Sequence, residues 1–354
     1  MMRMMRTVVS GGVGTLLLGL VLGGSAAAQM QLNGAGATFP YPMYSKWFNV
    51  YIQVDPDTRF NYQSIGSGGG IKQITEETVD FGASDGPMTD EQLRAAPAHI
   101  LHFPTVMGAV VVTYNAEGVP AGLKLTPEAI AGIFLGKITK WNDPAIAGAN
   151  AGVNLPPRDI VVVHRSDGSG TSYIFTDYLS KVSREWNNKV GKGTSVNWPA
   201  GLGGKGNEGV TGLVKQTPFS LGYVELIYAQ SNALPFADVK NKSGAFVTPS
   251  LESVTAAAAG FADTMPEDFR VSITDAPGAA AYPISGMTWL LVYQKQKDAE
   301  KGKRLVRFLD WMMHDGQQHA AALHYAPLPA QVVAKEAVAL QAVTGPDGKP
   351  LAAR

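Results

Sequence analysis

The stretch that decides the fold is HRSDGSGTSYIF, residues 164–175. It follows four β-branched residues, 160–163, a run typical of a buried strand. Apolar residues then recur at helical spacing over residues 173–179. These patterns predict a strand that ends, turns and enters a helix within residues 164–172.

The residues of this turn favour the binding of an oxyanion. A helix start exposes unpaired backbone N–H groups and the positive end of the helix dipole. Gly168 and Gly170 let the backbone approach a ligand, and Ser169 and Thr171 add hydroxyl donors. Arg165 offers a planar fork that fits two oxygens of a tetrahedral anion. An ordinary capped helix with a surface arginine is the alternative.

Three further strand ends carry polar residues of the same kind. Thr38 lies at a glycine-rich turn before an aromatic helix, and Ser67 lies in the turn 66–70 after the strand expected at 59–65. Asp85 follows a strand expected at 79–84. Ligands of open α/β sheets bind beyond the carboxyl ends of the strands. We therefore predict that these side chains converge with Arg165 on one anion site.

Composition narrows the class of protein. The chain has 354 residues, enough for two domains, with 45% apolar and 16% charged residues. A formal net charge of zero argues against a nucleic-acid partner and against a membrane-surface binder. Cysteine is absent, which excludes disulfides and lipid attachment through an N-terminal cysteine.

Residues 1–28 have the pattern of a signal peptide. Arg3 and Arg6 precede an apolar stretch, and Ser25 begins a run of small residues suited to cleavage. An uncleaved anchor is the alternative. We expect a mature protein that is soluble, not lipidated and located in the periplasm.

Two long apolar strands, expected at 105–114 and 282–293, suggest paired crossovers between two lobes. One lobe would combine residues 29–113 with 286–354, and the other would hold residues 114–285. Bending is expected near Val112–Tyr114 and Ile284–Gly286, because both crossovers must bend together.

Other functional motifs are weak. Gly201, Gly203 and Gly206 fit the spacing of a dinucleotide-binding loop, but no clear strand precedes them. Residues 82–86 match the Gly-x-Ser-x-Gly pattern without a helix opening after it. The histidines are scattered, and cysteine ligands are lacking. We expect no cofactor and no metal site.

Seven segments together resemble the periplasmic phosphate-binding proteins of ABC-type phosphate importers. They are GAGATFPYPMYSKW (34–47), NYQSIGSGGGIKQI (61–74), VDFGASDGPMT (79–89), HRSDGSGTSYIFTDYLSKV (164–182), VNWPAGLGGKGNEGV (196–210), LGYVELIYA (221–229) and YPISGMTWLLV (282–292). The resemblance implies an α/β, two-lobed periplasmic binding protein fold of type II. Each lobe would be a mostly parallel sheet flanked by helices, with two crossover strands at the hinge.

The resemblance also implies high-affinity binding of one inorganic phosphate between the lobes and its delivery to the membrane permease. The residues it assigns to phosphate are Thr38, the Phe39 backbone N–H, Ser67, Asp85, Arg165, Asp167, Ser169, Gly170 and Thr171. The sequence departs from the family at Gly68, where a second serine is more frequent, and this puts the rigidity of the turn in question.

Asp85 and Asp167 are expected to set specificity, because a buried carboxylate repels an anion that brings no proton to share. Phosphate carries a proton near neutral pH, whereas sulfate carries none. We expect a monomeric binding protein and not an enzyme. A secreted phosphatase, an adhesion or scavenging protein, and a binder of another oxyanion remain alternatives.

Overall fold

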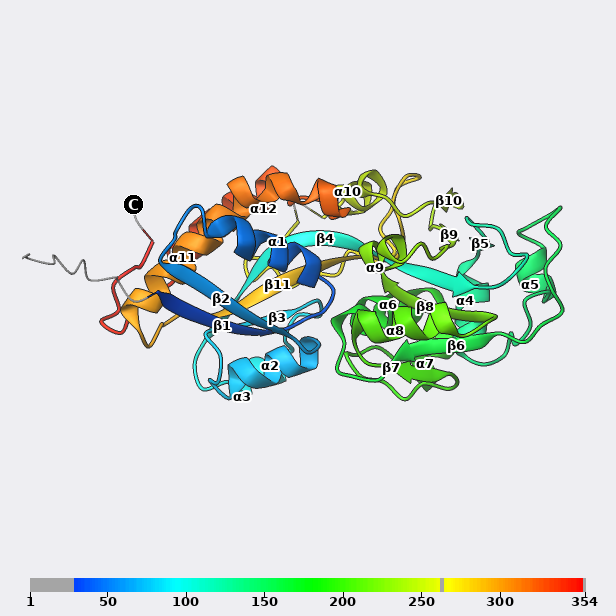
Figure 1. Cartoon of the computed structure of the whole chain (residues 1–354), viewed down its shortest axis with the longest axis horizontal. Helices are drawn as coiled ribbons and strands as arrows, with labels where there is room; N and C mark the ends of the chain where they lie inside the picture. The colour runs from blue at the N-terminus through cyan, green and yellow to red at the C-terminus, as the bar shows by residue number, and fades with distance from the viewer. Residues whose placement is uncertain (1–28, 262–263, 353–354) are drawn as a thin grey trace, which may run out of the picture.

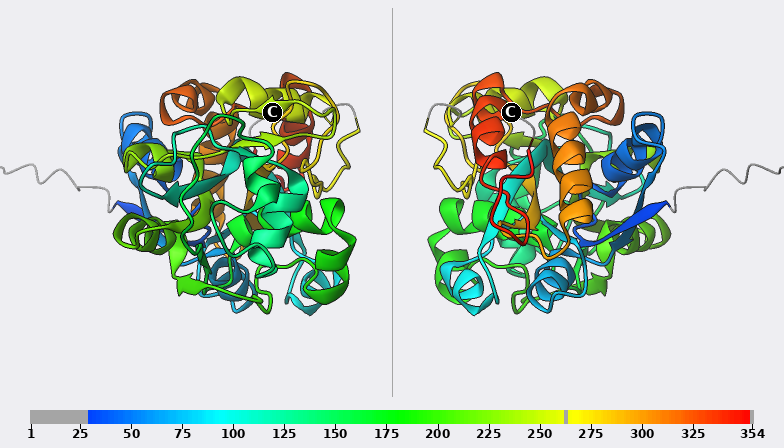
Figure 2. Two further views of the ribbon diagram at one scale, coloured as in Figure 1. Left: turned by 90° about the vertical axis from the view of Figure 1, so that its right-hand side faces the viewer. Right: turned by 90° about the vertical axis from the view of Figure 1, so that its left-hand side faces the viewer.

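The computed structural model describes residues 29–261 and 264–352, so the expected signal peptide lies outside the described residues. Two lobes lie end to end along the long axis of the molecule, and strand β4 (Ile100–Asn115) runs from one into the other (Figure 1). The views along this axis show helices packed around the strands at either end (Figure 2). The predicted two-lobed α/β architecture is therefore present.

The first lobe is built on strands in the order β2-β1-β3-β11-β4. Its other strands are β1 (Met30–Gly36), β2 (Thr58–Ser64), β3 (Phe81–Ser84) and β11 (Ser285–Tyr293). β1 is parallel to β2 and β3, whereas β11 is antiparallel to both β3 and β4. Helices of this lobe are α1 (Tyr41–Tyr51), α2 (Ser67–Thr75), α3 (Asp90–Ala95), α11 (Ala299–Met313) and α12 (Ala330–Leu340).

The second lobe continues the same sheet in the order β4-β8-β6-β7. Its strands are β6 (Val161–Arg165), β7 (Leu202–Gly204) and β8 (Ser220–Glu225), and β5 (Lys124–Leu125), β9 (Asp238–Lys240) and β10 (Phe246–Val247) form a small separate sheet. The helices between these strands are α4 (Pro127–Phe134), α5 (Pro144–Ala147), α6 (Gly170–Val182), α7 (Arg184–Lys189), α8 (Gly206–Gln216), α9 (Leu226–Ser231) and α10 (Leu251–Ala259). The sheet is mixed, because its outer pairs are parallel and its central pairs antiparallel.

β4 changes its partner at the junction of the lobes. It pairs with β11 up to Ala109 and with β8 from Val110 onward. The switch falls between adjacent residues, two positions before the bend expected at Val112–Tyr114. The residue boundaries of the lobes and the position of the hinge remain predictions.

The structure differs from the turn expected at residues 66–70, because helix α2 begins at Ser67, inside that glycine run. The segment that holds Gly201, Gly203 and Gly206 contains β7 and the start of α8. α11 ends at Met313, and the chain continues in 3-10 turns. Tertiary packing overrides the poor helix propensity of glycine in α2 and α8.

The segment that returns from the second lobe to β11 contacts both lobes. Arg270 Nη1 donates to Met88 O at 2.9 Å and to Asp90 Oδ1 at 2.7 Å, in the first lobe. Ser272 and Thr274 donate hydroxyl hydrogen bonds of 2.6 Å to Asp177 on α6. The return segment thus ties the turn after β3 to helix α6.

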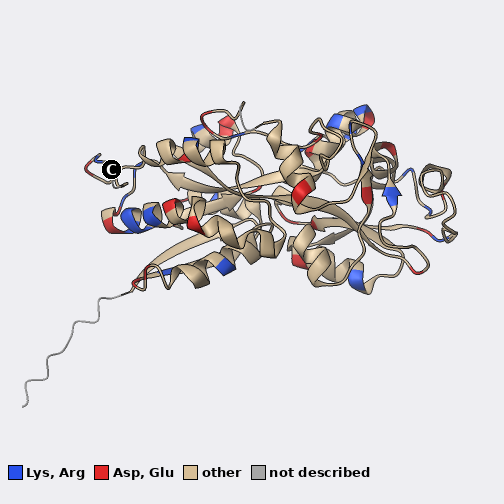
Figure 3. Ribbon diagram, turned by 90° about the horizontal axis from the view of Figure 1, so that it is seen from above, with Lys and Arg blue, Asp and Glu red and all other residues tan. Residues whose placement is uncertain are grey.

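Charged residues of both signs are scattered over the outer helices (Figure 3), consistent with the net charge of zero. Among the residues that the structure describes, no helix combines the length and apolar character needed to span a bilayer.

Gly70 provides a test of how tightly α2 packs on the sheet. A Cβ atom there would lie 2.6 Å from Ala83 O and from Gly36 Cα, both in the backbone of the strands beneath. Because backbone cannot yield as a flexible side chain can, we expect Gly70→Ala to lower the free energy of unfolding by about 1–3 kcal/mol. Gly212→Ala in α8 is the matched control, since no atom other than its chain neighbours and its own helix backbone lies within 4 Å of its Cβ position. Denaturant melts showing equal stability for the two variants would contradict this packing.

Candidate functional site

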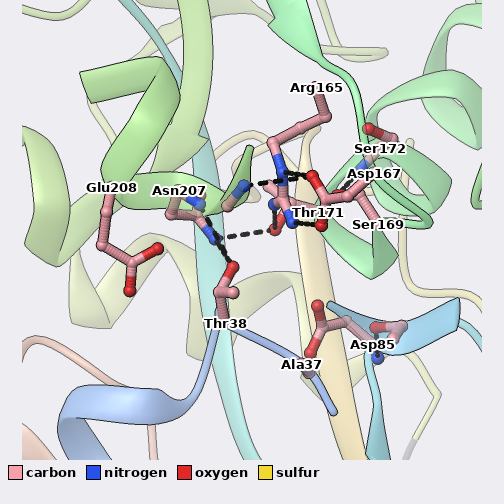
Figure 4. Close-up of polar contacts among 12 residues, drawn as sticks. Ala37, Thr38, Asp85, Arg165, Asp167, Ser169, Thr171, Ser172, Asn207 and Glu208 are labelled. Carbon is pink, nitrogen blue, oxygen red and sulfur yellow. Dashed lines mark hydrogen bonds and ion pairs between the residues drawn. The ribbon is translucent and has the colours of Figure 1, made fainter. Parts of the chain in front are cut away.

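The predicted residues meet beyond the ends of β1, β2, β3 and β6, between the two lobes, and Figure 4 labels Thr38, Asp85, Arg165, Asp167, Ser169 and Thr171 among them. Thr38 and Phe39 follow β1, Ser67 opens α2, Asp85 follows β3, Arg165 ends β6, Asp167 lies in the next turn, Ser169 caps α6, and Gly170 and Thr171 are its first residues. A Cβ on Gly170 would lie 2.5 Å from Asp85 Oδ2, so the start of α6 sits directly against the first lobe. Convergence of the four strand ends is observed.

Arg165 and Asp167 form a buried ion pair. The carboxylate accepts from Arg165 Nε at 2.8 Å and from Nη2 at 2.6 Å, and Arg165 is 2% exposed. Asp167 Oδ1 also accepts from the Gly206 N–H at 3.0 Å. Burial opposes the ionisation of Asp167, but the hydrogen bonds and charge of Arg165 outweigh it and hold its pKa below the usual value.

This geometry narrows the role expected for Asp167. Both carboxylate oxygens are engaged by Arg165, so Asp167 orients the guanidinium and is not positioned as a free acceptor. The guanidinium edge turned away from Asp167 keeps N–H groups for a ligand.

Four hydroxyls around the site share one feature: each accepts a hydrogen bond from an N–H group. The acceptor–donor pairs are Thr38 Oγ1 with Asn207 N (3.2 Å), Ser67 Oγ with Asp85 N (3.1 Å), Ser169 Oγ with Ser172 N (2.9 Å) and Thr171 Oγ1 with Asn207 Nδ2 (3.0 Å). Because each N–H group bonds a lone pair of the hydroxyl oxygen, the hydroxyl proton remains available for an acceptor in the cleft.

Backbone N–H groups add to these donors. The first N–H groups of α2 and α6 have no partner within their helices, and both helix starts face the site. Gly66, which precedes α2, has φ 90°, a conformation that favours glycine. The Phe39 N–H likewise makes no hydrogen bond to the described residues.

Asp85 is the acceptor among these donors. Its Oδ1 accepts from Thr288 Oγ1 at 2.8 Å, whereas Oδ2 has no hydrogen-bond partner in residues 29–261 and 264–352. The residue is 1% exposed, and burial raises its pKa to about 7, against the opposing effects of Thr288 and Arg165. Asp85 Oδ2 is thus directed to a partner that brings a proton.

The lobes also contact each other directly. Gly68 N donates to Gly168 O at 2.8 Å, and a Cβ on Gly68 would lie 3.0 Å from Gly168 Cα. Across the same gap, Tyr228 OH donates to Thr38 O at 2.5 Å. The departure from the family at Gly68 therefore falls where two backbones approach closely.

Sequence reasoning missed Asn207, Thr288 and Tyr228. Asn207 is fully buried and reaches both Thr38 and Thr171, although its segment reads as a glycine-dense loop. Thr288 reads as one residue of an apolar strand. The available signal is that all three lie within segments that carry the family resemblance.

Among the described residues, the histidines lie away from the serines of the site. His164 stacks on Trp198 with ring centroids 4.9 Å apart, and its Nδ1 is 2.9 Å from Arg165 O. Across the described residues, no histidine hydrogen-bonds Ser67, Ser84 or Ser169, and no metal-ligating cluster occurs.

Comparison with known proteins gives the family. A profile of the PBP superfamily domain matches residues 23–315. The chain is 48% identical over 322 residues to Phosphate-binding protein PstS of Pasteurella multocida, covering 90% of this chain and 93% of that protein. It is 40% identical over 321 residues to the protein of the same name from Methanocaldococcus jannaschii, covering 84% and 82%.

Solved structures show the same fold. A high-affinity periplasmic phosphate-binding protein, PfluDING, bound with phosphate, has a TM-score of 0.69 at 22% identity, covering 87% of this chain and 93% of that one. A putative phosphate ABC transporter substrate-binding protein with bound phosphate from Clostridium perfringens has a TM-score of 0.62 at 19% identity, covering 85% and 100%. The expected type II periplasmic binding fold is confirmed, and the chain belongs to the PstS family of the PBP superfamily.

Proposed function

We propose that this protein binds inorganic phosphate between its lobes in the periplasm and delivers it to the membrane permease of a phosphate ABC importer. The observation that carries the proposal is Asp85 Oδ2, a buried acceptor without a partner in the described residues, surrounded by N–H and O–H donors. The names of the relatives and the phosphate bound in related folds support the choice of anion.

Each residue then has a separate role. Thr38, the Phe39 N–H and Ser67 donate to phosphate from the first lobe, and Ser169, Gly170 and Thr171 donate from the second. Arg165 pairs with two phosphate oxygens through the guanidinium edge that Asp167 leaves free. Asp167 acts through Arg165, and Asp85 accepts the proton that phosphate carries.

Specificity follows from that single acceptor. An ionised Asp85 gains a hydrogen bond from protonated phosphate, but it faces an unshared oxygen of sulfate. Sites built around a required donor reject analogues lacking it by factors on the order of 10⁴. This favours phosphate over sulfate or molybdate.

The protein acts as a soluble monomer released by cleavage of residues 1–28, without a cofactor or metal. A binding role is preferred to a phosphatase because, in the described residues, no histidine bonds Ser67 or Ser169, and each of these hydroxyls accepts from a backbone N–H and keeps its proton for a ligand.

Calorimetric titration of the mature protein, stripped of bound ligand, tests the function. We expect tight one-to-one binding of phosphate and no heat with sulfate. Binding of neither anion would overturn the proposal, and turnover of a chromogenic phosphate ester would replace it with the phosphatase.

Replacing Asp85 should weaken the discrimination. Asp85→Asn removes the charge that repels sulfate, and its amide can donate to either anion. We expect the preference for phosphate to fall by at least about tenfold in competition titrations. Asp177→Asn is the matched control, because Asp177 is also 1% exposed but bonds Lys192 and Ser272 and not the cleft. Unchanged preference in Asp85→Asn would remove Asp85 from this role.

The same residue should make sulfate competition depend on pH. Burial raises the pKa of Asp85 to about 7, so the carboxyl is protonated below that pH and can donate to an unprotonated sulfate oxygen. Sulfate should therefore compete better at about pH 5.5 than at about pH 8, and this change should vanish in Asp85→Asn. A competition curve that is flat with pH in the parent protein would contradict the assignment.

Closure should depend on the glycine contact between the lobes. Gly68→Val places a side chain against Gly168, so we expect little phosphate-induced compaction in X-ray scattering and an affinity at least about tenfold lower. Gly212→Val, in open space on α8, controls for the substitution itself. Full compaction of Gly68→Val would show that this contact does not limit closure.

A further inference from the structure

We propose that Asn207 is a positioning residue that fixes the hydroxyls of Thr38 and Thr171 as hydrogen-bond donors toward the bound anion. This inference deepens the proposed function and rests on it. Asn207 is fully buried at the start of α8, between the two threonines (Figure 4).

The orientation of the Asn207 amide is determined by its neighbours. The Glu225 backbone N–H lies 2.9 Å from Oδ1, and a backbone N–H can only donate. The oxygen must therefore face Glu225, and the NH₂ group faces Thr38 Oγ1 at 2.7 Å and Thr171 Oγ1 at 3.0 Å. One amide supplies both of its protons to the two hydroxyls.

Each of the two threonine hydroxyls accepts a second hydrogen bond from another N–H group. Thr38 Oγ1 also accepts from Asn207 N at 3.2 Å, and Thr171 Oγ1 also accepts from Arg165 Nη1 at 3.3 Å. A hydroxyl oxygen has two lone pairs, so both are occupied and only the O–H proton is left. Thr38 cannot accept a proton from a ligand without losing a bond to Asn207, and Thr171 cannot do so without losing a bond to Asn207 or to Arg165.

The two threonines lie on different lobes. Thr38 follows β1 in the first lobe, whereas Thr171 and Asn207 belong to α6 and α8 of the second. The amide can therefore polarise both hydroxyls only when the lobes are together. In the closed site, Asp85 remains the place for the ligand's proton, because these hydroxyls have no free lone pair to accept one.

Asn207→Asp tests this role with almost no change of volume. An ionised carboxylate accepts from both threonines, which turns their protons away from the anion and adds a repelling charge. We expect phosphate affinity at about pH 8 to fall by at least about 100-fold. The loss should shrink as pH is lowered, because a protonated carboxyl can again donate to one threonine. The parent protein should lack this recovery.

Asn241→Asp is the matched control. Asn241 is also buried, and its amide donates to Gly278 O and Ala281 O outside the cleft. It should lower the melting temperature without changing phosphate affinity or its pH profile. If Asn207→Asp has the affinity and pH profile of the parent protein, the inference is overturned. If the parent protein itself binds no phosphate, the proposed function fails instead.

A variant pair covers the case in which Asn207→Asp does not fold. Asn207→Ala should weaken phosphate binding less in a Thr38→Val background than in the parent protein, because the hydroxyl it orients is already gone. Strictly additive losses in the calorimetric affinities would show that Asn207 does not act through Thr38.

Discussion

The buried ion pair of Arg165 and Asp167 is the interaction on which the site depends. A guanidinium that is 2% exposed is tolerable only beside a carboxylate, and removal of one partner of such a pair costs about 3–5 kcal/mol. Asp167 is itself held by the Gly206 N–H, so the pair also fixes the start of α8. The hydroxyl donors are arranged around Arg165, whose charge Asp167 balances. The N–H groups on the guanidinium edge that Asp167 does not bond are left to contact an anion.

Much of this arrangement could be predicted from the sequence, because strand–glycine–helix units leave a local pattern. Thr38, Ser67 and Arg165 each lie at such a unit, Asp85 follows a strand directly, and all four meet at one edge of the sheet. The glycine run 66–70 predicts a turn, whereas α2 begins at Ser67, because the packing that holds glycines in a helix is not local. Asn207 was missed for a similar reason, since its partners Thr38 and Glu225 are brought to it only by the fold.

Strand β4 is shared by the two lobes. Its pairing passes from β11 to β8 between Ala109 and Val110, so each lobe holds its own part of one strand. The return segment adds a second link, through Arg270 on one side and Ser272 on the other. The turn after β3, which carries Asp85, and helix α6 are therefore joined in two ways: through the strands of the sheet and through the return segment.

The bonds that join the lobes at Thr38 are all neutral. They come from the Asn207 amide and backbone N–H and from the Tyr228 hydroxyl, and none needs the anion to form. Such bonds act on the lifetime of the closed state more than on the rate of encounter with the ligand. Because a neutral hydrogen bond is weaker than a charge-assisted one, these contacts hold the lobes together at Thr38 less tightly than an ion pair in the same place would.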